Sequence, residues 1–431
     1  MSAIEVTVIG AGIVGLCVAH SLTQAGALVT VIDRDPDGDK CSYGNAGGIA
    51  VTEVVPASSP RVWTQVLDWM ADPLGPLAVR PAHALKLLPW LLRFAKSSAP
   101  REVERISGAL AALNARVYED LVPILRDIEL SDELQRQGAL SVYETEAGFE
   151  RDSAEWDLRR RHGVVAEELT GAQARQLEPA LGPSVCRAVF TPQWSHVSDP
   201  KRLVQVLKVW LLKQGVTIRT GEAQHILTDS PSSLFVRLGG DIQIRADRLV
   251  IAAGAWSGPL ARQLGDRVLL ESERGYNATL PTPGITVVRE LIFAERKFVA
   301  TPLSCGLRIG GAAEFGGLSA AANFKRSRAL VEIACRYLPN LRTDGATNWA
   351  GHRPATPDSV PVIGPSARHP NVLYAFGHGH LGLTQAATTG RLISELVFRK
   401  TPSIDLTPYS IGRFRHSYRE GSYAPTHFPL R

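Results

Sequence analysis

The chain has 431 residues, 45% of them hydrophobic, which is enough for two domains with a large core. Its 47 basic and 42 acidic residues give a formal charge of +5, too balanced to indicate nucleic-acid binding. Five cysteines without metal-like spacing indicate neither a disulfide framework nor a metal site, and neither a signal peptide nor a membrane-spanning segment is predicted.

The first residues predict a nucleotide-binding turn between a strand and a helix. The apolar run 4–9 is typical of a buried strand, and a Gly-x-Gly-x-x-Gly motif follows it. Gly10 is expected to make the tight turn, Gly12 to admit a pyrophosphate, and Gly15 to let the helix pack on the strand. The residues assigned here to cofactor binding are Gly10, Ala11, Gly12, Ile13, Val14 and Gly15.

A second predicted strand, 28–32, ends at Asp33, which lies 23 residues after Gly10. An acid at this distance is expected to accept a hydrogen bond from a ribose hydroxyl, with Arg34 beside it. The following stretch, 41–49, is dense in small residues, so we expect a flat, bulky group to pass against its backbone. A mobile surface loop is the alternative. The cofactor-binding residues assigned in this stretch are Ser42, Asn45, Ala46, Gly47 and Gly48.

The middle of the chain is read mainly as helices and short strands. Segment 84–96 is very apolar with interspersed basic residues, which fits either a helix packed on the substrate domain or an interfacial helix at a membrane. Pro89 would kink either helix. Further predicted elements are one or two long helices in 101–136, a strand at 139–145, a capped helix at 169–179, a helix from 199 to 214, a strand at 216–219, and a hairpin of 234–238 with 242–245 around Gly239-Gly240.

Two later stretches again bring small residues to the end of a strand. Segment 246–257 predicts a buried strand whose end approaches the cofactor through Ala253, Gly254 and Trp256. Residues 265–345 read as an antiparallel sheet with a helix at 325–337. A strand at 371–376 then meets a glycine-rich turn that opens a helix reaching about 397, whose N-terminus carries partial positive charge. The cofactor-binding residues assigned there are Gly377, Gly379, Leu381, Gly382, Leu383 and Thr384.

Three glycine-rich approaches far apart in the sequence imply a ligand larger than NAD, and FAD is the economical choice. The predicted fold class is α/β (α+β overall), with a Rossmann-like FAD-binding domain and an antiparallel-sheet substrate-binding domain. We assign 1–58, 198–262 and 350–431 to the first domain and 59–197 and 263–349 to the second. The FAD is expected to be non-covalent, because no Cys or His motif indicates a covalent link.

Motifs along nearly the whole chain carry a family resemblance. They are the segments 8–15, 42–47, 249–257, 274–276, 351–358, 361–364 and 377–382. In this order they resemble the D-amino-acid oxidase (DAO) superfamily of flavoproteins, and within it the bacterial D-amino acid dehydrogenases and related glycine- and hydroxyproline-oxidising enzymes. The dehydrogenase branch often has other residues at the positions of Gly48 and His380.

The resemblance implies an FAD domain roofed by an antiparallel sheet, and four candidate catalytic residues. Arg353 is the expected carboxylate anchor, because a guanidinium matches a carboxylate bidentately; the alternative is a structural Arg that pairs with Asp358 or caps a carbonyl. Tyr276 would add a hydrogen bond to the carboxylate, or would be a core Tyr. His378 or His380 would contact the flavin or the substrate amine, and the alternative is a structural His.

The leading interpretation is an FAD-dependent D-amino acid dehydrogenase. Hydride transfer from the α-carbon to flavin N5 would give an imino acid, then a 2-oxo acid and ammonia, with electrons passing to a quinone or other respiratory acceptor. The alternatives are a D-proline or hydroxyproline dehydrogenase, a glycine- or sarcosine-like oxidase that makes hydrogen peroxide, a non-catalytic flavin electron-transfer subunit and, more weakly, an NAD-binding dehydrogenase. The protein is expected in the cytoplasm, and the alternative is peripheral contact with the inner face of the cell membrane.

Overall fold

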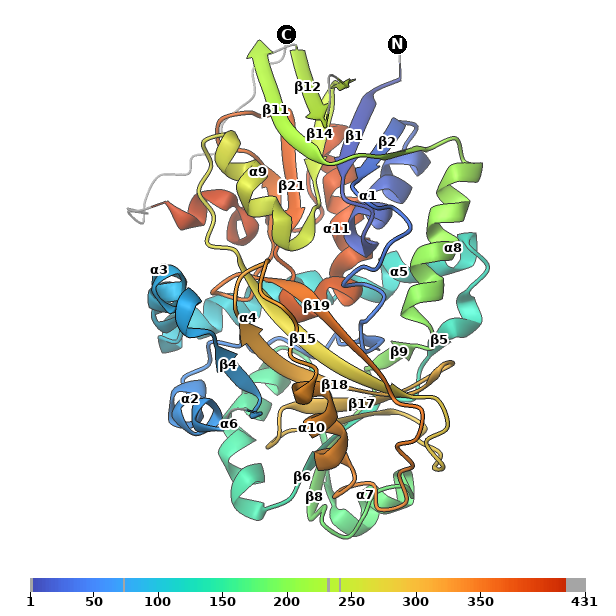
Figure 1. Cartoon of the computed structure of the whole chain (residues 1–431), viewed down its shortest axis with the longest axis vertical. Helices are drawn as coiled ribbons and strands as arrows, with labels where there is room; N and C mark the ends of the chain where they lie inside the picture. Colours follow the sequence, from blue (N-terminus) through green and yellow to red (C-terminus); the bar gives the residue numbers. More distant parts are fainter. Residues whose placement is uncertain (1–2, 73, 231–232, 240–241, 416–431) are drawn as a thin grey trace.

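A computed structural model describes residues 3–72, 74–230, 233–239 and 242–415. Figure 1 shows an elongated molecule in which two sheets are stacked along the long axis. The upper half contains a mostly parallel sheet, and the lower half contains a larger, strongly twisted sheet. The chain crosses between the two halves several times, so segments far apart in the sequence meet at the junction.

The upper sheet has six strands in the order β10-β2-β1-β14-β21-β20, and all neighbours are parallel except β20 and β21. The chain leaves β1 for β2 on one side and comes back to β14 on the other, so the strand order reverses beside β1. Ligands bind at the carboxyl ends of the strands at such a point. The strands are β1 (Glu5–Ile9), β2 (Leu28–Asp33), β10 (Thr217–Thr220), β14 (Arg248–Ile251), β20 (Val362–Pro365) and β21 (Val372–Phe376).

Successive residues of these strands face opposite sides of the upper sheet. Val8 packs in a core with helices on one side, whereas its neighbour Ile9 packs with a helix and a small sheet on the other. Gly390 lets two helices of the first side touch, because a Cβ there would overlap the carbonyl of Cys17. The first side holds α1 (Ile13–Gln24), α8 (Pro200–Lys213) and α11 (Gly382–Val397), and the second holds α9 (Ser257–Gln263).

The small sheet on the second side is antiparallel, in the order β11-β12-β13. Its strands are β11 (Ala223–Ser230), β12 (Ser233–Leu238) and β13 (Gln243–Ala246). The predicted hairpin is therefore present as β12 and β13, although Gly240 of its turn lies outside the described residues. Strand β11 was not predicted, because its polar sequence has no clear alternation.

The lower sheet has nine strands in the order β19-β15-β18-β17-β16-β6-β8-β7, with β4 paired to β18. Most neighbours are antiparallel, as expected from the sequence, but β16 with β6 and β18 with β4 are parallel. The strands are β4 (Leu77–Val79), β6 (Ala139–Tyr143), β7 (Glu167–Thr170), β8 (Arg187–Thr191), β15 (Glu271–Leu280), β16 (Glu290–Phe293), β17 (Phe298–Leu303), β18 (Gly306–Phe315) and β19 (Thr347–Ala355). The helices of this half are α6 (Glu146–Arg161), α7 (Gly171–Leu177) and α10 (Lys325–Ala334).

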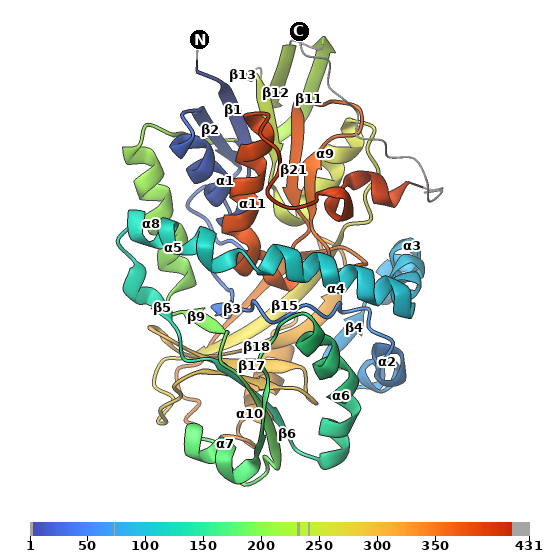
Figure 2. The ribbon, with the colours of Figure 1, turned by 180° about the vertical axis from the view of Figure 1, so that it is seen from behind.

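Four helices between residues 62 and 127 connect the halves. They are α2 (Val62–Ala71), α3 (Pro81–Ser97), α4 (Pro100–Asn114) and α5 (Val117–Asp127). Figure 2 shows α4 and α5 crossing in front of α11, and residues such as Leu113 and Leu121 belong to the same core as α1 and α11. These two helices thus pack with the upper half, although the predicted boundaries placed them in the substrate domain. The division into domains stays a prediction.

Short elements complete the chain. A three-stranded sheet at the junction joins β3 (Gly48–Ile49), β9 (Ser195–Val197) and β5 (Leu134–Gln135), and 3-10 turns occur at η1 (Ser131–Glu133), η2 (Gly254–Trp256), η3 (Gly379–Leu381), η4 (Thr407–Tyr409) and η5 (Ile411–Phe414). Within the described part of the chain, every helix is too short or too polar to cross a bilayer.

Candidate active site

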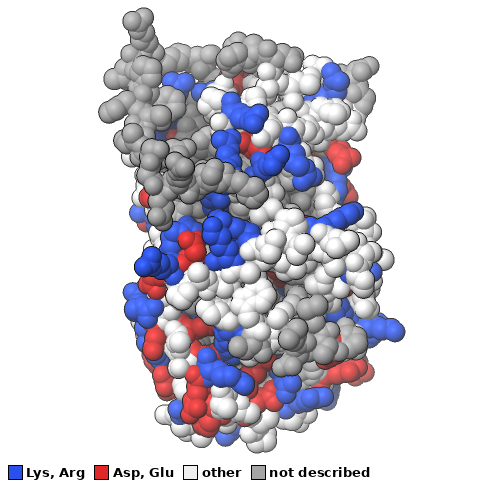
Figure 3. All heavy atoms as spheres, turned by 90° about the vertical axis from the view of Figure 1, so that its left-hand side faces the viewer, with Lys and Arg blue, Asp and Glu red and all other residues white. Residues whose placement is uncertain are grey.

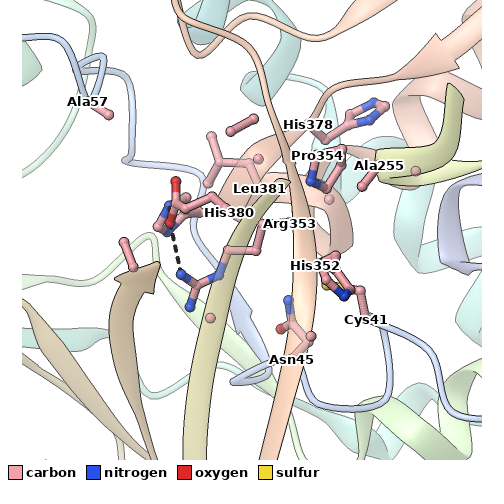
Figure 4. Close-up of a pocket in the computed structure, with 18 of the residues that line it drawn as sticks. Cys41, Asn45, Ala57, Ala255, His352, Arg353, Pro354, His378, His380 and Leu381 are labelled. Carbon is pink, nitrogen blue, oxygen red and sulfur yellow. Dashed lines mark hydrogen bonds and ion pairs between the residues drawn. The ribbon is translucent and has the colours of Figure 1, made fainter. Parts of the chain in front are cut away.

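A cavity of about 1920 Å³ lies at the junction of the two halves. The carboxyl ends of β1 and β2 contribute Gly12 and Asp33, the lower sheet contributes Glu273 and Arg353, and the start of α11 contributes Gly382. All five stretches that the sequence analysis assigned to the cofactor, 10–15, 33–34, 42–48, 253–256 and 377–384, contribute residues to this cavity. Figure 4 shows part of it, with Asn45, Arg353 and His380 drawn from different elements.

In the first glycine turn, two of the three glycines make close contacts that a side chain would prevent. Gly10 has a φ of +112°, and a Cβ on it would overlap the carbonyl of Ala252 in the segment after β14. A Cβ on Gly15 would overlap the carbonyl of Gly10, so both glycines are required for packing. Gly12 differs, because the nearest atom to a Cβ there is Ser42 Oγ at 3.6 Å. Its side faces the cavity, as a pyrophosphate-binding position requires.

Asp33 lies at the end of β2, beside this turn. Its Oδ2 accepts the backbone N–H of Ala11 at 2.7 Å, and its Oδ1 accepts from Lys40 Nζ at 3.2 Å. The carboxylate is therefore held at the rim of the cavity, while its bond to a ribose stays a prediction. Arg34 stacks over the ring of Trp256, 4.1 Å from its centroid, so two predicted cofactor residues that follow β2 and β14 meet here.

The stretch 41–48 is anchored to both halves of the molecule. Ser42 Oγ accepts the N–H of Ile13 at the start of α1, and Asn45 Oδ1 accepts the N–H of Gly47 at 2.7 Å. Arg308 of β18 donates to the carbonyl of Asn45 at 2.6 Å. These bonds do not fit a mobile surface loop, and they leave the small residues of the stretch against the cavity.

The turn before α11 supplies a further contact to the same stretch. Thr384 Oγ1 accepts the N–H of Ala50 at 3.0 Å, and Leu383 and Thr384 are both buried. Gly377 and Gly379 have φ values of +86° and +52°, which favour glycine. Among the residues that the structure describes, no side chain caps the start of α11, so its first N–H groups are available to a ligand.

The residues present fit FAD. A Cβ on Gly254 or on Gly379 would meet no atom within 4 Å, so both glycines border open space in the cavity. The start of α11 can present N–H groups to a negative ring edge, and the first turn can receive a pyrophosphate. Ala46, Ala253 and Trp256 line the space between these points.

Arg353 lies on β19 directly opposite Glu273 of β15. Its Nη1 donates to Glu273 Oε1 at 2.9 Å and to the carbonyl of Ala312 at 3.2 Å. The guanidinium lies over Gly275, where a Cβ would overlap it. Among the described residues the recorded bonds of Arg353 use Nη1, which leaves the Nε–Nη2 edge for a bidentate carboxylate.

The alternative pairing of Arg353 with Asp358 is not found. Asp358 instead accepts from Arg413 at 2.8 Å and is almost completely buried. Arg353 does contact a carbonyl, that of Ala312, in addition to Glu273.

The two candidate histidines have different surroundings. His378 is buried, and its Nε2 lies 2.9 Å from Thr389 Oγ1; burial lowers its pKa to about 3. His380 lies at the other side of this turn, with Nε2 2.7 Å from Glu273 Oε1. Figure 4 shows Arg353 and His380 close together and His378 farther away. His378 is therefore neutral and lies within hydrogen-bond distance of Thr389, and His380 faces the carboxylate. A contact of either histidine with flavin or substrate stays a prediction.

Tyr276 is a fully buried core residue of the lower sheet. Its hydroxyl donates to Glu314 Oε2 at 2.9 Å and accepts the N–H of Asn323 at 3.0 Å. This arrangement corresponds to the alternative of a core Tyr, although Tyr276 also borders the cavity. Its bond to a substrate carboxylate stays a prediction that requires the hydroxyl to change partner.

Two carboxylates of the site were missed by the sequence analysis. The Glu273 carboxylate contacts both Arg353 and His380. Burial alone would raise the pKa of Glu273. The two neighbouring groups outweigh burial and lower this pKa to about 2. Glu290 lies against Gly48, accepts from Trp194 Nε1 at 3.0 Å, and has a pKa raised to about 8 by burial. No spacing signal identifies them, because only the register of the sheet brings them to the cavity.

A Rossmann-like sheet, a second glycine turn before a C-terminal helix and a roofing sheet together define a two-part FAD-dependent oxidoreductase. The family comparison agrees, because the DAO family model, described as FAD dependent oxidoreductase, matches residues 5–396. The chain belongs to this family, and it is an FAD-dependent enzyme.

Curated relatives cover nearly the whole chain. A "D-amino-acid oxidase" of Bradyrhizobium diazoefficiens is 34% identical over 417 residues, covering 95% of this chain and 99% of the relative. A "D-amino acid dehydrogenase" of Paramagnetospirillum magneticum is 33% identical over 433 residues, with the same two coverages. Among solved structures, glycine oxidase from Geobacillus kaustophilus has a TM-score of 0.72 at 21% identity, covering 96% of this chain and 100% of that chain, which shows the shared fold.

Proposed function

We propose that this enzyme oxidises the Cα–N bond of a D-amino acid. The observation that carries the proposal is Arg353, which lines the cavity that also receives the start of α11 and which bonds to other described residues through Nη1. An Arg in this place can hold an amino acid by its carboxylate and so fix the distance of the α-carbon from the cofactor. The names of the relatives support an amino-acid substrate of the D series.

Each residue of the site has a separate proposed role. FAD, when bound, supplies the hydride acceptor. Arg353 binds the carboxylate, while Glu273 and the carbonyl of Ala312 hold the guanidinium in place. Gly275 gives the guanidinium room. The amine must be neutral for its lone pair to assist as hydride leaves the α-carbon, and the resulting imino acid is hydrolysed to a 2-oxo acid and ammonia.

The electron acceptor is proposed to be a quinone or another respiratory carrier. Helix α3 supports membrane contact for this purpose: Leu85, Leu88 and Leu92 are 86%, 50% and 64% exposed, on one face. Leu87 and Trp90 are buried against the protein, so α3 both packs on the protein and presents an apolar face. Figure 3 views this side of the molecule, where basic side chains border a broad uncharged area. Basic residues beside apolar anchors suit an anionic membrane surface.

The deciding experiment is an anaerobic flavin-reduction screen of the holoenzyme. D- and L-amino acids, glycine, sarcosine and both proline series are mixed with the enzyme, and bleaching of the oxidised flavin is followed. We expect D-amino acids to bleach it. Failure of every amine would contradict the enzyme proposal and favour a non-catalytic electron-transfer subunit.

Product assays separate the remaining alternatives. A primary D-amino acid releases ammonia, whereas D-proline or a hydroxyproline gives a cyclic imine and releases none. An oxidase makes hydrogen peroxide with oxygen alone, whereas a dehydrogenase requires an artificial dye or quinone acceptor.

A further inference from the structure

The carboxylate of Glu273 is shared between a permanent cation and a histidine. Its Oε1 accepts from Arg353 Nη1 at 2.9 Å and lies 2.7 Å from His380 Nε2. Glu273 comes from β15, which is paired on both sides, and its side chain is largely buried, whereas the His380 side chain is 58% exposed and borders the cavity. A rigid strand thus aims a carboxylate at one ring nitrogen of a histidine whose other nitrogen, Nδ1, remains for a ligand.

The other groups near this pair keep a constant charge through the neutral pH range. Arg353 stays protonated. Burial raises the pKa of the Cys41 thiol to about 11, with Arg353, Asp39 and Glu273 as its charged neighbours. Burial, Arg274 and Arg34 lower the pKa of His352 to about 4. His378 is also neutral, because burial lowers its pKa to about 3.

We propose that Glu273 and His380 form a proton-accepting dyad for the substrate ammonium, with His380 as the catalytic base and Glu273 as its positioning residue. This inference rests on the proposed function, because it concerns the amine of the same substrate. Arg353 has two roles in this proposal. Its Nη1 donates to Glu273 and orients it, and the Nε–Nη2 edge of the guanidinium is left for the substrate carboxylate. For the dyad to act, the amine of a substrate held there must lie on the side of the cavity that His380 borders.

The proton balance of this step is simple. An N–H bond of the ammonium breaks, a proton binds Nδ1 of His380, and the electron pair remains on the substrate nitrogen. Glu273 faces Nε2 and stabilises the imidazolium that forms. Because His380 is more than half exposed, it can pass the proton to solvent and return to the neutral form.

The test is anaerobic flavin reduction of the holoenzyme with D-alanine and D-proline as probes, from pH 5.5 to 10. We expect His380→Asn to lower the second-order reduction rate about 100-fold at pH 7. The deficit should close above the pKa of the substrate ammonium, where the amine is already neutral. Glu273→Gln should move the acidic limb of the profile to lower pH, since the imidazolium loses its stabilising carboxylate.

Controls separate a proton-transfer role from a structural one. His225→Asn changes an exposed histidine of β11 outside the cavity lining, and should leave the profile unchanged. Free imidazole should restore part of the rate of His380→Ala, and combining Glu273→Gln with His380→Asn should add little to the loss from His380→Asn. Lys297 and Glu290 also border the cavity, with pKa values near 8, but a limb due to either would survive His380→Asn.

The outcomes are distinguishable. A deficit of His380→Asn that is equal at every pH, with full flavin content and no imidazole rescue, would overturn the dyad while leaving the proposed function intact. If neither probe nor any other amine reduces the flavin of the wild-type protein, the proposed function itself fails and the dyad fails with it.

Discussion

Arg353 gains its significance from what lies around its guanidinium. Glu273 and Ala312 hold Nη1, Gly275 provides space beneath the group, and the cavity lies beyond it. The same carboxylate that orients Arg353 also contacts His380. The role proposed for Arg353 therefore depends on neighbours that strand pairing brings to its guanidinium.

Replacing Arg353 by Lys tests the carboxylate anchor. Lysine keeps the charge but lacks the planar fork, so we expect kcat/KM for a D-amino acid to fall about 100-fold, the equivalent of one lost charge-assisted bond. FAD content, read from the visible absorption spectrum, should stay unchanged. A colourless variant would instead assign Arg353 a structural role in the cofactor site.

Gly12→Val tests the placement of the pyrophosphate. The first atoms of a side chain at this position meet no protein atom closer than Ser42 Oγ, so the polypeptide should still fold. The branched side chain would occupy the path of the cofactor, and we expect purified protein with native circular dichroism but no flavin. Retention of flavin at wild-type stoichiometry would refute this placement. Gly108→Val, in α4 outside the cavity lining, is the matched control, because the nearest atom to a Cβ there is His162 Cε1 at 4.0 Å.

Glu290 predicts a dependence of stability on pH. Burial raises its pKa in the folded protein to about 8, so between pH 4.5 and 8 the folded state binds a proton that the unfolded state has lost. The contribution of this group is complete below the unfolded pKa, and it falls by up to about 1.4 kcal/mol for each pH unit as the pH rises towards 8. The difference in unfolding free energy between pH 6 and pH 8, measured with urea, should be smaller for Glu290→Gln than for the wild-type protein. An equal pH dependence in both proteins would show that Glu290 is ionised in the native state.

At the scale of elements, helix α3 has two faces with different tasks. Leu87 and Trp90 pack on the protein, and the indole of Trp90 donates to the carbonyl of Ala355. The opposite face exposes Leu85, Leu88 and Leu92. Both sequence interpretations of this segment therefore describe part of the same helix, and membrane contact stays the proposed function of its outer face.

Changing the outer face of α3 tests that contact. We expect the triple variant Leu85→Ser, Leu88→Ser, Leu92→Ser to lose binding to vesicles with anionic lipids in a flotation assay. Removal of about three leucines from the bilayer interface costs several kcal/mol of binding free energy. Dye-linked oxidation of substrate in solution should be unaffected. Equal flotation of both proteins would contradict membrane contact through α3.

At the scale of the whole molecule, the cavity is bordered by both halves, so cofactor binding and global stability are linked. A ligand that binds only the folded state at 100 times its Kd adds about 2.7 kcal/mol to the unfolding free energy. We expect the Tm of the apoprotein to be several degrees below that of the holoenzyme and to rise with added FAD. A Tm independent of FAD concentration would contradict a cofactor enclosed between the halves, and NAD at equal concentration is the control.

The sequence by itself determined the nucleotide-binding turns and the nature of the cofactor, and it predicted segments that line one cavity. These features depend on local backbone requirements: Gly10 and Gly15 are needed within one strand-turn-helix unit, and the glycines at 377–382 within another. Local rules also identified α8, α10 and α11.

Only the tertiary structure decided which polar residues share the cavity and which helices belong to each half. Glu273 faces Arg353 because β15 and β19 are paired in one register, and Glu290 of β16 meets Gly48 of β3 across a contact between two different sheets. Likewise, α4 and α5 join the core of α11 although they lie between segments of the lower half. Such contacts depend on residues distant in the chain, and neither spacing nor composition specifies strand register or helix docking.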